Sequence, residues 1–123
     1  MTLIDTSAWI HSLRPDGDRD VSSRVKELLE SGEASWCPLI QLELWNGARG
    51  EKERPGMTEM AASLPSLPID DEVWSTAYGL ARSAHAQGHT VPATDLIIAA
   101  CARRHGVRLE HDDSHLEVIQ TLH

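Results

Sequence analysis

The chain has 123 residues, 41% of them hydrophobic, and a formal net charge of −8. This length and composition suit an ordinary folded core, so we expect a single domain over residues 1–123 and exclude wholesale disorder. The acidic balance excludes a protein that coats nucleic acid mainly by neutralising phosphates, because such proteins are basic. A nuclease stays open, since its carboxylates hold the cations that meet phosphate.

Several features of the sequence bear on cellular location. It contains no run of 18 apolar residues, so no membrane-spanning helix is expected. The first residues include no basic segment, and Asp5 interrupts the opening apolar run, so a signal peptide is not expected. Cys37 and Cys101 lie in apolar segments, which favours buried, reduced thiols. We therefore expect a protein of the cytoplasm without membrane contact.

The first third of the chain predicts a strand and two helices. Residues 3–5 contain a short apolar run that predicts the first strand, and the hydroxyls after it suit the cap of a helix over residues 6–13. Residues 14–18 have the composition of a turn. Apolar residues at helical spacing predict a second helix over residues 21–29, which Gly32 ends.

The middle of the chain predicts a second strand, a helix and then a flexible segment. Residues 34–37 predict the strand, and Pro38 suits the first turn of a helix that ends at Gly47 or Gly50. Residues 50–56 are charged and contain proline and glycine, so we expect them to be flexible.

The second half continues the alternation of strands and helices. Residues 64–69 are punctuated by proline and predict a short strand. Asp70 suits the N-cap of a long helix that Gly88 closes. A further helix is expected over residues 94–105, followed by a short strand over residues 107–109.

This alternation predicts a parallel sheet that helices cover on both faces. The expected fold class is therefore α/β, a three-layer αβα domain with a central parallel sheet of four or five strands. In such a sheet the working site lies at the carboxyl ends of the strands. Asp5 and Asp113 follow two of the predicted strands, so we expect both at that edge.

Four acidic residues adjoin apolar segments: Asp5, Glu43, Asp95 and Asp113. A carboxylate beside a buried segment is costly unless another group satisfies its charge. One divalent cation can satisfy several carboxylates at once. Each acid alone has a simpler explanation, as a helix cap, an exposed helix side chain or a loop residue. The four together predict a metal-dependent enzyme.

A zinc site is a weaker alternative. His111, Asp113 and His115 alternate in the sequence, so on a strand they would face one way and suit Zn²⁺. Asp112 and Ser114, which lie between them, favour a turn instead. Stoichiometric zinc in the purified protein would support this alternative.

Cys37 and the tryptophans are explained mainly by packing. A nucleophilic role for Cys37 is disfavoured, because no basic residue lies near it in the sequence to lower its pKa. The four tryptophans are expected to fill the core. Trp9 is the one for which we also consider contact with a partner subunit or partner protein, because it follows Asp5 by four residues.

Four stretches of the sequence match a family pattern. They are residues 3–10 (LIDTSAWI), 41–47 (QLELWNG), 93–100 (ATDLIIAA) and 109–119 (LEHDDSHLEVI). In these stretches the chain resembles PIN-domain ribonucleases, and among them the VapC toxins of bacterial toxin–antitoxin pairs. The resemblance spans essentially the whole chain. Its most specific part is the combination of the Asp-Thr-Ser opening with the Asp-x-x-Ile-Ala-Ala helix.

The resemblance implies roles for particular side chains. The residues expected to bind Mg²⁺ or Mn²⁺ and to carry catalysis are Asp5, Glu43, Asp95 and Asp113, with hydrogen-bonding support from Thr6 or Ser7. The family's last motif often reads Asp-x-Asp-Phe, whereas this chain reads DSHL from residue 113. His115 replaces an acid there and Asp112 adds one, so Asp112 is an alternative to Asp113 as the fourth ligand.

The activity that the resemblance implies is endonucleolytic hydrolysis of RNA by a metal-activated water, leaving a 5′-phosphate and a 3′-hydroxyl. It also implies a homodimer and a VapB-type antitoxin, whose C-terminal segment covers the site and sets a basic side chain among the carboxylates. The RNA would be a tRNA, a ribosomal RNA or an mRNA. The candidates to guide it toward the acids are Arg49, Lys52, Arg54, Arg103 and Arg104.

Two other functions are weighed against this one. A non-catalytic PIN-like module would bind RNA or a protein without cleaving, and the presence of all four acids argues against it. A metal-dependent phosphatase or DNase on a similar fold is a more distant alternative. Carboxylate-dependent binding of Mn²⁺ tests the first alternative, and activity on DNA rather than RNA tests the second.

Overall fold

A computed structural model describes residues 1–47 and 54–122 of the chain, and within them three strands form one parallel sheet. The strands are β1 (Thr2–Ile4), β2 (Ala34–Ser35) and β3 (Arg108–Glu110), in the order β2-β1-β3. Leu3 of β1 pairs with Ser35 on one side and with Leu109 on the other. Every residue of β1 is buried, as expected for the central strand of a sheet covered on both faces.

Helices connect these strands and continue to the end of the described chain. They are α1 (Thr6–Leu13), α2 (Arg19–Glu30), α3 (Pro38–Asn46), α4 (Arg54–Ser63), α5 (Asp71–Ala86), α6 (Ala93–Arg104) and α7 (Ser114–Gln120). The N-caps of α1, α2, α5 and α7 are aspartates whose side chains accept hydrogen bonds from backbone N–H groups of the first turn. Gly32 and Gly88 follow α2 and α5 with φ of 75° and 79°, a conformation that glycine adopts without strain.

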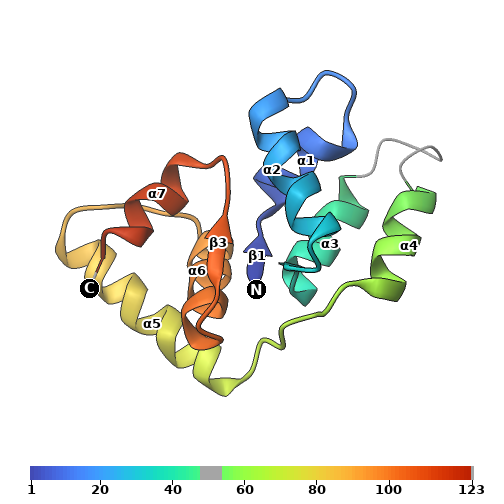
Figure 1. Ribbon diagram of the computed structural model, residues 1–123. Helices are drawn as coiled ribbons and strands as arrows, with labels where there is room; N and C mark the ends of the chain where they lie inside the picture. Colours follow the sequence, from blue (N-terminus) through green and yellow to red (C-terminus); the bar gives the residue numbers. More distant parts are fainter. Residues whose placement is uncertain (48–53, 123) are drawn as a thin grey trace.

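Figure 1 shows how the helices surround the strands. α5, α6 and α7 gather on one side of β1, and α1 to α4 lie on the other. α5 packs on α6 and α6 on α7, while α1 packs on α2 and α3. β1 leads into α1 and β3 leads toward α7 at the same edge of the sheet, because the strands are parallel. Side chains that follow these two strands therefore meet.

The strand count corrects one expectation. The described residues contain three strands rather than four or five, because the stretch over residues 64–69 contributes only one bridge, from Ser66 to Trp36. Pro65 and Pro68 lack the backbone N–H groups that a continuous ladder needs. The α/β class and the parallel direction of the sheet are confirmed.

The segment before that bridge corrects a second expectation. Residues 54–63 form α4, where the sequence predicted a flexible segment up to residue 56 and no helix after it. The expectations for Arg49, Gly50 and Lys52 fall outside the described residues, as does the side chain of Arg54. No helix of the described chain is both long and apolar enough to cross a membrane.

The tryptophans divide between the core and the surface. Trp9 and Trp36 are buried, and their ring centroids lie 6.2 Å apart. α1 turns Trp9 inward, so the idea that Trp9 contacts a partner is wrong. Trp45 and Trp74 are exposed, which corrects the expectation that the tryptophans fill the core.

Candidate metal centre

The carboxyl edge of the sheet gathers the four acids that the sequence singled out. Asp5 follows β1 and caps α1, whereas Asp113 follows β3 after a short loop and caps α7. Asp95 lies in the first turn of α6, and Glu43 lies on α3. Asp5, Glu43 and Asp113 all raise the pKa of Asp95 through their charges. The fold therefore brings four acids from four separate helices or their caps within electrostatic reach of one another, but among the described residues the group of ligand atoms within 4.8 Å of one another includes Asp95 and Asp113 and not Asp5 or Glu43.

Ser7 holds the Asp5 carboxylate in place. Asp5 Oδ2 accepts a 3.0 Å hydrogen bond from the backbone N–H of Ser7 and a 2.6 Å bond from the Ser7 hydroxyl. The backbone N–H of Asp5 donates to the carbonyl of Glu110 at 2.9 Å, which joins the end of β1 to β3. The orientation of this buried carboxylate is thus set before any ligand binds.

Thr6 plays the corresponding part for Glu43. The Thr6 hydroxyl donates a 2.8 Å hydrogen bond to Glu43 Oε1 across 37 residues of sequence. Burial raises the pKa of Glu43, the hydrogen bond from Thr6 opposes that rise, and the charges of Asp5 and Asp113 add to it. Both hydroxyls that the sequence suggested as supports therefore contact the acids, each a different one.

Asp95 is the least satisfied of the four acids. Only 8% of its surface is exposed, and among the described residues no N–H or O–H group donates a hydrogen bond to its carboxylate. Burial raises the pKa of Asp95 to about 6, and the charges of Asp113 and Asp5 contribute to the rise. A nearly buried carboxylate without a donor, repelled by its neighbours, fits a bound cation.

His115 stands next to Asp95 and Asp113. Its Nδ1 lies 3.8 Å from Asp95 Oδ2 and 3.7 Å from Asp113 Oδ1, distances beyond a hydrogen bond. The three side chains each offer a ligand atom, and these atoms all lie within 4.8 Å of one another. The donor set is rich in carboxylate oxygen, which suits a divalent cation such as Mg²⁺ or Mn²⁺.

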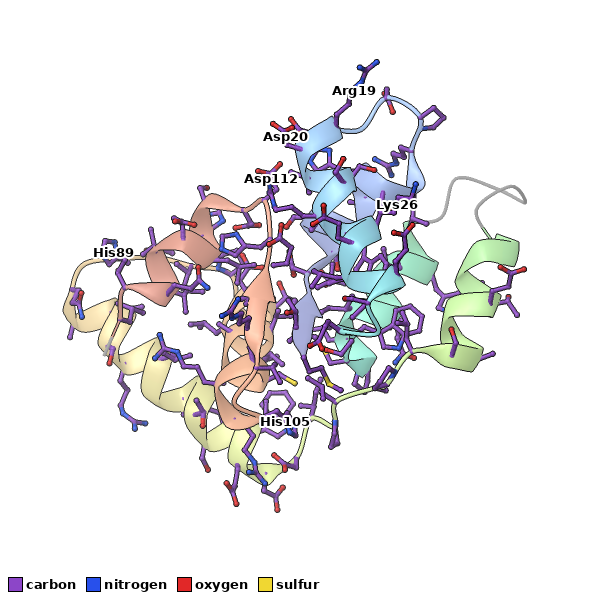
Figure 2. All side chains as sticks on the ribbon, in the orientation of Figure 1. Arg19, Asp20, Lys26, His89, His105 and Asp112 are labelled. Carbon is purple, nitrogen blue, oxygen red and sulfur yellow. The ribbon has the colours of Figure 1, made fainter. Side chains whose placement is uncertain are left out.

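Asp112 belongs to a different contact. Its Oδ2 lies 2.8 Å from His11 Nε2, and its backbone N–H donates to the Ser7 hydroxyl at 2.9 Å. Figure 2 shows Asp112 pointing toward the start of α2, and Asp18 there donates its backbone N–H to His11 Nδ1 at 2.8 Å. Asp113 rather than Asp112 thus faces the other acids. Sequence reasoning missed His11, because a histidine in the last turn of a short helix carries no recognisable signal.

The alternating zinc site is not formed. His111 and Asp113 lie in the loop between β3 and α7, not on a strand. The Nε2 atom of His111 lies 2.8 Å from Gln120 Oε1, and its Nδ1 accepts the backbone N–H of Asp113 at 3.2 Å. Both ring nitrogens of His111 are therefore engaged away from His115.

Arg103 and Arg104 lie at the wrong end of α6 to flank the acids. They are eight and nine residues beyond Asp95, about 12 to 14 Å along the helix axis. Arg103 Nη2 donates to the carbonyls of Ile119 and Leu122 at 3.0 Å each, which anchors the chain after α7. Arg104 pairs with acids before and within α5. Both side chains have partners within the fold and lie far along α6 from the acids, which does not support the expectation that they flank this centre.

Comparisons with known proteins agree with this arrangement. The PIN domain family matches residues 2–121. Ribonuclease VapC11 of Mycobacterium tuberculosis is 37% identical, over 97% of this chain and 91% of the relative. FitAcB from Neisseria gonorrhoeae has a TM-score of 0.76 at 21% identity, covering 97% of this chain and 92% of that chain. VapBC-5 from M. tuberculosis has a TM-score of 0.70 at 21% identity, covering 98% and 90%.

The fold is that of a PIN domain, and the family match extends over nearly the whole chain. The chain therefore belongs to the PIN-domain family, and to its VapC type. The resemblance seen in the sequence motifs is thus confirmed.

Proposed function

We propose that this protein is a metal-dependent endoribonuclease, the toxin of a type II toxin–antitoxin pair. The relative at 37% identity is named a ribonuclease, which supports RNA as the substrate. We further propose that the chain is a single domain, acts in the cytoplasm and forms a homodimer. The proposed catalytic and metal-binding residues are Asp5, Glu43, Asp95 and Asp113.

The observation that carries this proposal is the state of Asp95. Its carboxylate is nearly buried, lacks a hydrogen-bond donor among the described residues, and has a pKa raised to about 6 by burial and by neighbouring carboxylates. A purely structural acid in such a place would be expected to find a donor. A cation that Asp95 shares with the other acids accounts for both the burial and the clustering.

The residues of the chain divide the work of binding and orientation. Ser7 fixes Asp5, Thr6 fixes Glu43, and the caps of α1 and α7 hold Asp5 and Asp113 at the edge of the sheet. A divalent cation bound there supplies charge neutralisation on the phosphate and a lowered pKa for water, the two needs of phosphodiester hydrolysis. Mg²⁺ and Mn²⁺ both suit these oxygen ligands.

The proposed partner is a VapB-type antitoxin. VapBC-5 from M. tuberculosis, which shares the fold, is named as a member of the VapBC family of toxin–antitoxin systems. Leu42 and Trp45 are exposed on α3, on either side of Glu43 in sequence, and offer an apolar surface beside the acids. An antitoxin that covers this surface and sets an Arg or Lys among the carboxylates would compete with the metal. Inhibition that is indifferent to substitution of that Arg or Lys would contradict this competition.

The first test is cleavage of total RNA by the purified full-length protein with Mg²⁺ or Mn²⁺, with EDTA, and with Asp5→Asn. Asn is also a good N-cap, so this substitution removes the charge while keeping the start of α1. We expect discrete fragments with 5′-phosphate and 3′-hydroxyl ends that vanish with EDTA and in the variant. Cleavage that survives both controls, or products with 2′,3′-cyclic ends, would contradict the mechanism.

A titration with Mn²⁺ tests the non-catalytic alternative on the same samples. A module that only binds RNA or protein has no need for a metal, so it would not bind Mn²⁺ in a manner that depends on Asp5 and Asp95. Parallel assays with single-stranded DNA test whether RNA is the preferred substrate. The fragments that form can be sequenced to identify a tRNA, ribosomal RNA or mRNA target.

A further inference from the structure

We propose that His115 is a nitrogen ligand of the metal in this carboxylate cluster, and that it shifts the preference of the site from Mg²⁺ toward Mn²⁺. The inference rests on the proposed function, because it concerns the same metal centre. It assigns to the protein a mixed carboxylate and imidazole site, where the related sequence motif has a second acid in place of His115.

The position of the His115 ring is the first support. Its Nδ1 lies 3.8 Å from Asp95 Oδ2 and 3.7 Å from Asp113 Oδ1. An ion about 2.1 Å from each of its ligands separates adjacent ligand atoms by about 3 Å and opposite ones by about 4.2 Å in octahedral geometry. The observed distances fall between these limits, whereas they exceed the reach of direct hydrogen bonds. The two separations from His115 therefore suit a shared ion, and the carboxylate oxygens of Asp95 and Asp113 lie within 4.8 Å of each other.

The Asp95 carboxylate is the second and independent support. The Asp95 side chain is 12% exposed, and no described N–H or O–H group donates to its carboxylate. One of its carboxylate oxygens belongs to the group of atoms that lie within 4.8 Å of one another. A buried anion without a donor, aimed at the same point as Nδ1 of His115, indicates that a cation lies between them.

The first turn of α7 fixes His115 relative to Asp113. Asp113 caps this helix, and its Oδ1 accepts the backbone N–H of His115 at 2.7 Å and that of Leu116 at 3.1 Å. Both ligands thus belong to one rigid turn, and the exposed His115 side chain can adjust to the ion without moving the backbone. A neutral ring has one unprotonated nitrogen, and Nδ1 is the nitrogen that faces the carboxylates.

The consequence concerns metal choice. Mg²⁺ is hard and binds oxygen, whereas imidazole favours the transition metals of the first row. Replacing a carboxylate of the motif by His115 should therefore lower the relative affinity for Mg²⁺. The effect on Mn²⁺ should be smaller, because Mn²⁺ accepts nitrogen as well as oxygen ligands.

The opposite role for His115 is that of a counter-charge. A protonated ring would neutralise Asp95 and Asp113 in the absence of metal and would compete with the ion. The two roles predict opposite effects of removing the ring. His115→Ala weakens Mn²⁺ binding if His115 is a ligand, and strengthens it or leaves it unchanged if His115 is a counter-charge.

The experiment is pulsed electron paramagnetic resonance of Mn²⁺ bound to the full-length protein, combined with Mn²⁺ and Mg²⁺ titrations. His115→Ala removes the ring, His115→Asp restores the carboxylate of the related motif, and His89→Ala is the control. His89 is exposed, lies after α5 (Figure 2) and is not part of the group formed by Asp95, Asp113 and His115. We expect a ¹⁴N coupling to Mn²⁺ in the wild type and in His89→Ala, and its loss in His115→Asp with Mn²⁺ still bound.

The titrations give the second readout. His115→Ala should lower the Mn²⁺ affinity by at least about tenfold, the lower range for groups that support a metal site. His115→Asp should lower the ratio of Mn²⁺ to Mg²⁺ affinity. Mn²⁺ that binds the wild type without a ¹⁴N coupling, or that binds His115→Ala as tightly, would overturn the role of His115 and leave the metal centre intact. Failure of the wild type to bind Mn²⁺ would overturn both.

Discussion

Asp70 and Asp95 are both aspartates at the start of a helix, and the fold treats them in opposite ways. Asp70 caps α5, accepts the backbone N–H of Val73 at 3.0 Å and pairs with Arg104 at 3.1 Å. Asp95, in the first turn of α6, has no hydrogen-bond donor among the described residues and faces other carboxylates. The pKa of Asp70 is lowered, chiefly by the Val73 N–H and then by Arg104, while the pKa of Asp95 is raised.

This difference distinguishes a structural acid from a candidate functional acid in this chain. Each aspartate lies next to an apolar helix, so local sequence describes them alike. What separates them is the partner supplied by a distant part of the chain. Asp70 receives a cation from the end of α6, and Asp95 receives further anions from α1, α3 and α7. The carboxylates around Asp95 repel one another, and His115 offsets only part of that repulsion, so a bound cation would stabilise the cluster.

Asp95→Asn removes the carboxylate that distinguishes this position from Asp70, and we expect it to have the largest effect on activity. The substitution removes one ligand of the proposed metal, so we expect RNA cleavage to fall by at least about 100-fold, in line with the loss of a group that holds a catalytic metal. The same change relieves repulsion in the metal-free protein. We therefore expect its free energy of unfolding at pH 7 to rise by about 1 to 2 kcal/mol, after allowance for solvent screening.

Asp71→Asn is the matched control for that variant. Asp71 also lies in the first turn of a helix, α5, but its side chain is exposed. Cleavage assays and denaturant unfolding in EDTA should show neither the loss of activity nor the gain in stability with Asp71→Asn. If Asp95→Asn is no more stable than the wild type, the Asp95 carboxylate is not destabilised by its neighbours, and the contrast with Asp70 fails.

The second prediction concerns the dependence of stability on pH in the metal-free protein. The pKa of Asp95 is about 6 in the folded state, above its ordinary value of 3.8, so the folded state binds the extra proton between these values. Stability that Asp95 contributes in its protonated form is present below about pH 4 and is lost as pH rises through about 6. The pKa of Asp70 is lowered, so its contribution is present above its ordinary value and is lost as pH falls below about 4.

Difference measurements isolate these two contributions. The free energy of unfolding in EDTA should be measured from pH 3 to pH 8 for the wild type, Asp95→Asn and Asp70→Asn. The free energy of unfolding of Asp95→Asn should increase relative to the wild type as pH rises from about 4 to 6. Asp70→Asn should be less stable than the wild type above about pH 4, and this difference should disappear as pH falls below about 4. Saturating Mn²⁺ should remove the wild-type loss near pH 6, because a bound cation stabilises ionised carboxylates. If the three curves of unfolding free energy against pH run parallel, the opposite pH dependences predicted for Asp95 and Asp70 are wrong.

Much of the fold, and the choice of the four candidate acids, can be predicted from the sequence because they depend on local signals. Asp70 as a cap, Pro38 as a helix start and Gly88 as a helix end are each determined by a few neighbouring residues. The four acids were singled out because each stands beside an apolar run, and parallel strands bring their carboxyl ends together. The four-residue spacing of Trp9 from Asp5 is a poor basis for predicting contact with a partner, because α1 turns Trp9 into the core.

The features that escaped sequence reasoning depend on distant partners. α4 begins within a stretch of charge, proline and glycine, so composition there argued against a helix. The pairing of Arg104 with Asp70, and of His11 with Asp112, joins residues 34 and 101 positions apart. No local sequence pattern predicts contacts between residues so far apart in the chain. The same limitation leaves Asp112 as an alternative to Asp113 in the sequence, whereas in the structure Asp112 contacts His11 and Asp113 lies beside Asp95 and His115.

The smallest effect on cleavage is expected from Asp112→Asn, and comparing it with Asp113→Asn distinguishes the two neighbouring aspartates. Asp113→Asn keeps the cap of α7, because Asn also caps well, but it removes a carboxylate from the acid cluster, and cleavage should be lost. Asp112→Asn weakens an exposed contact with His11 and leaves the backbone N–H to Ser7 in place. Exposed ion pairs contribute between about 0 and 1 kcal/mol, so cleavage should fall by no more than about fivefold.

Cleavage rates and Mn²⁺ titrations of the two variants, measured side by side, complete the test. If Asp112→Asn lost as much activity and affinity as Asp113→Asn, the loop between β3 and α7 would have to rearrange when the metal binds, with Asp112 released from His11. A His11→Ala variant would then bind Mn²⁺ more tightly than the wild type, because Asp112 would already be free. With Asp113 as the ligand, His11→Ala should leave Mn²⁺ affinity nearly unchanged, since the Asp112 side chain lies outside the group formed by Asp95, Asp113 and His115.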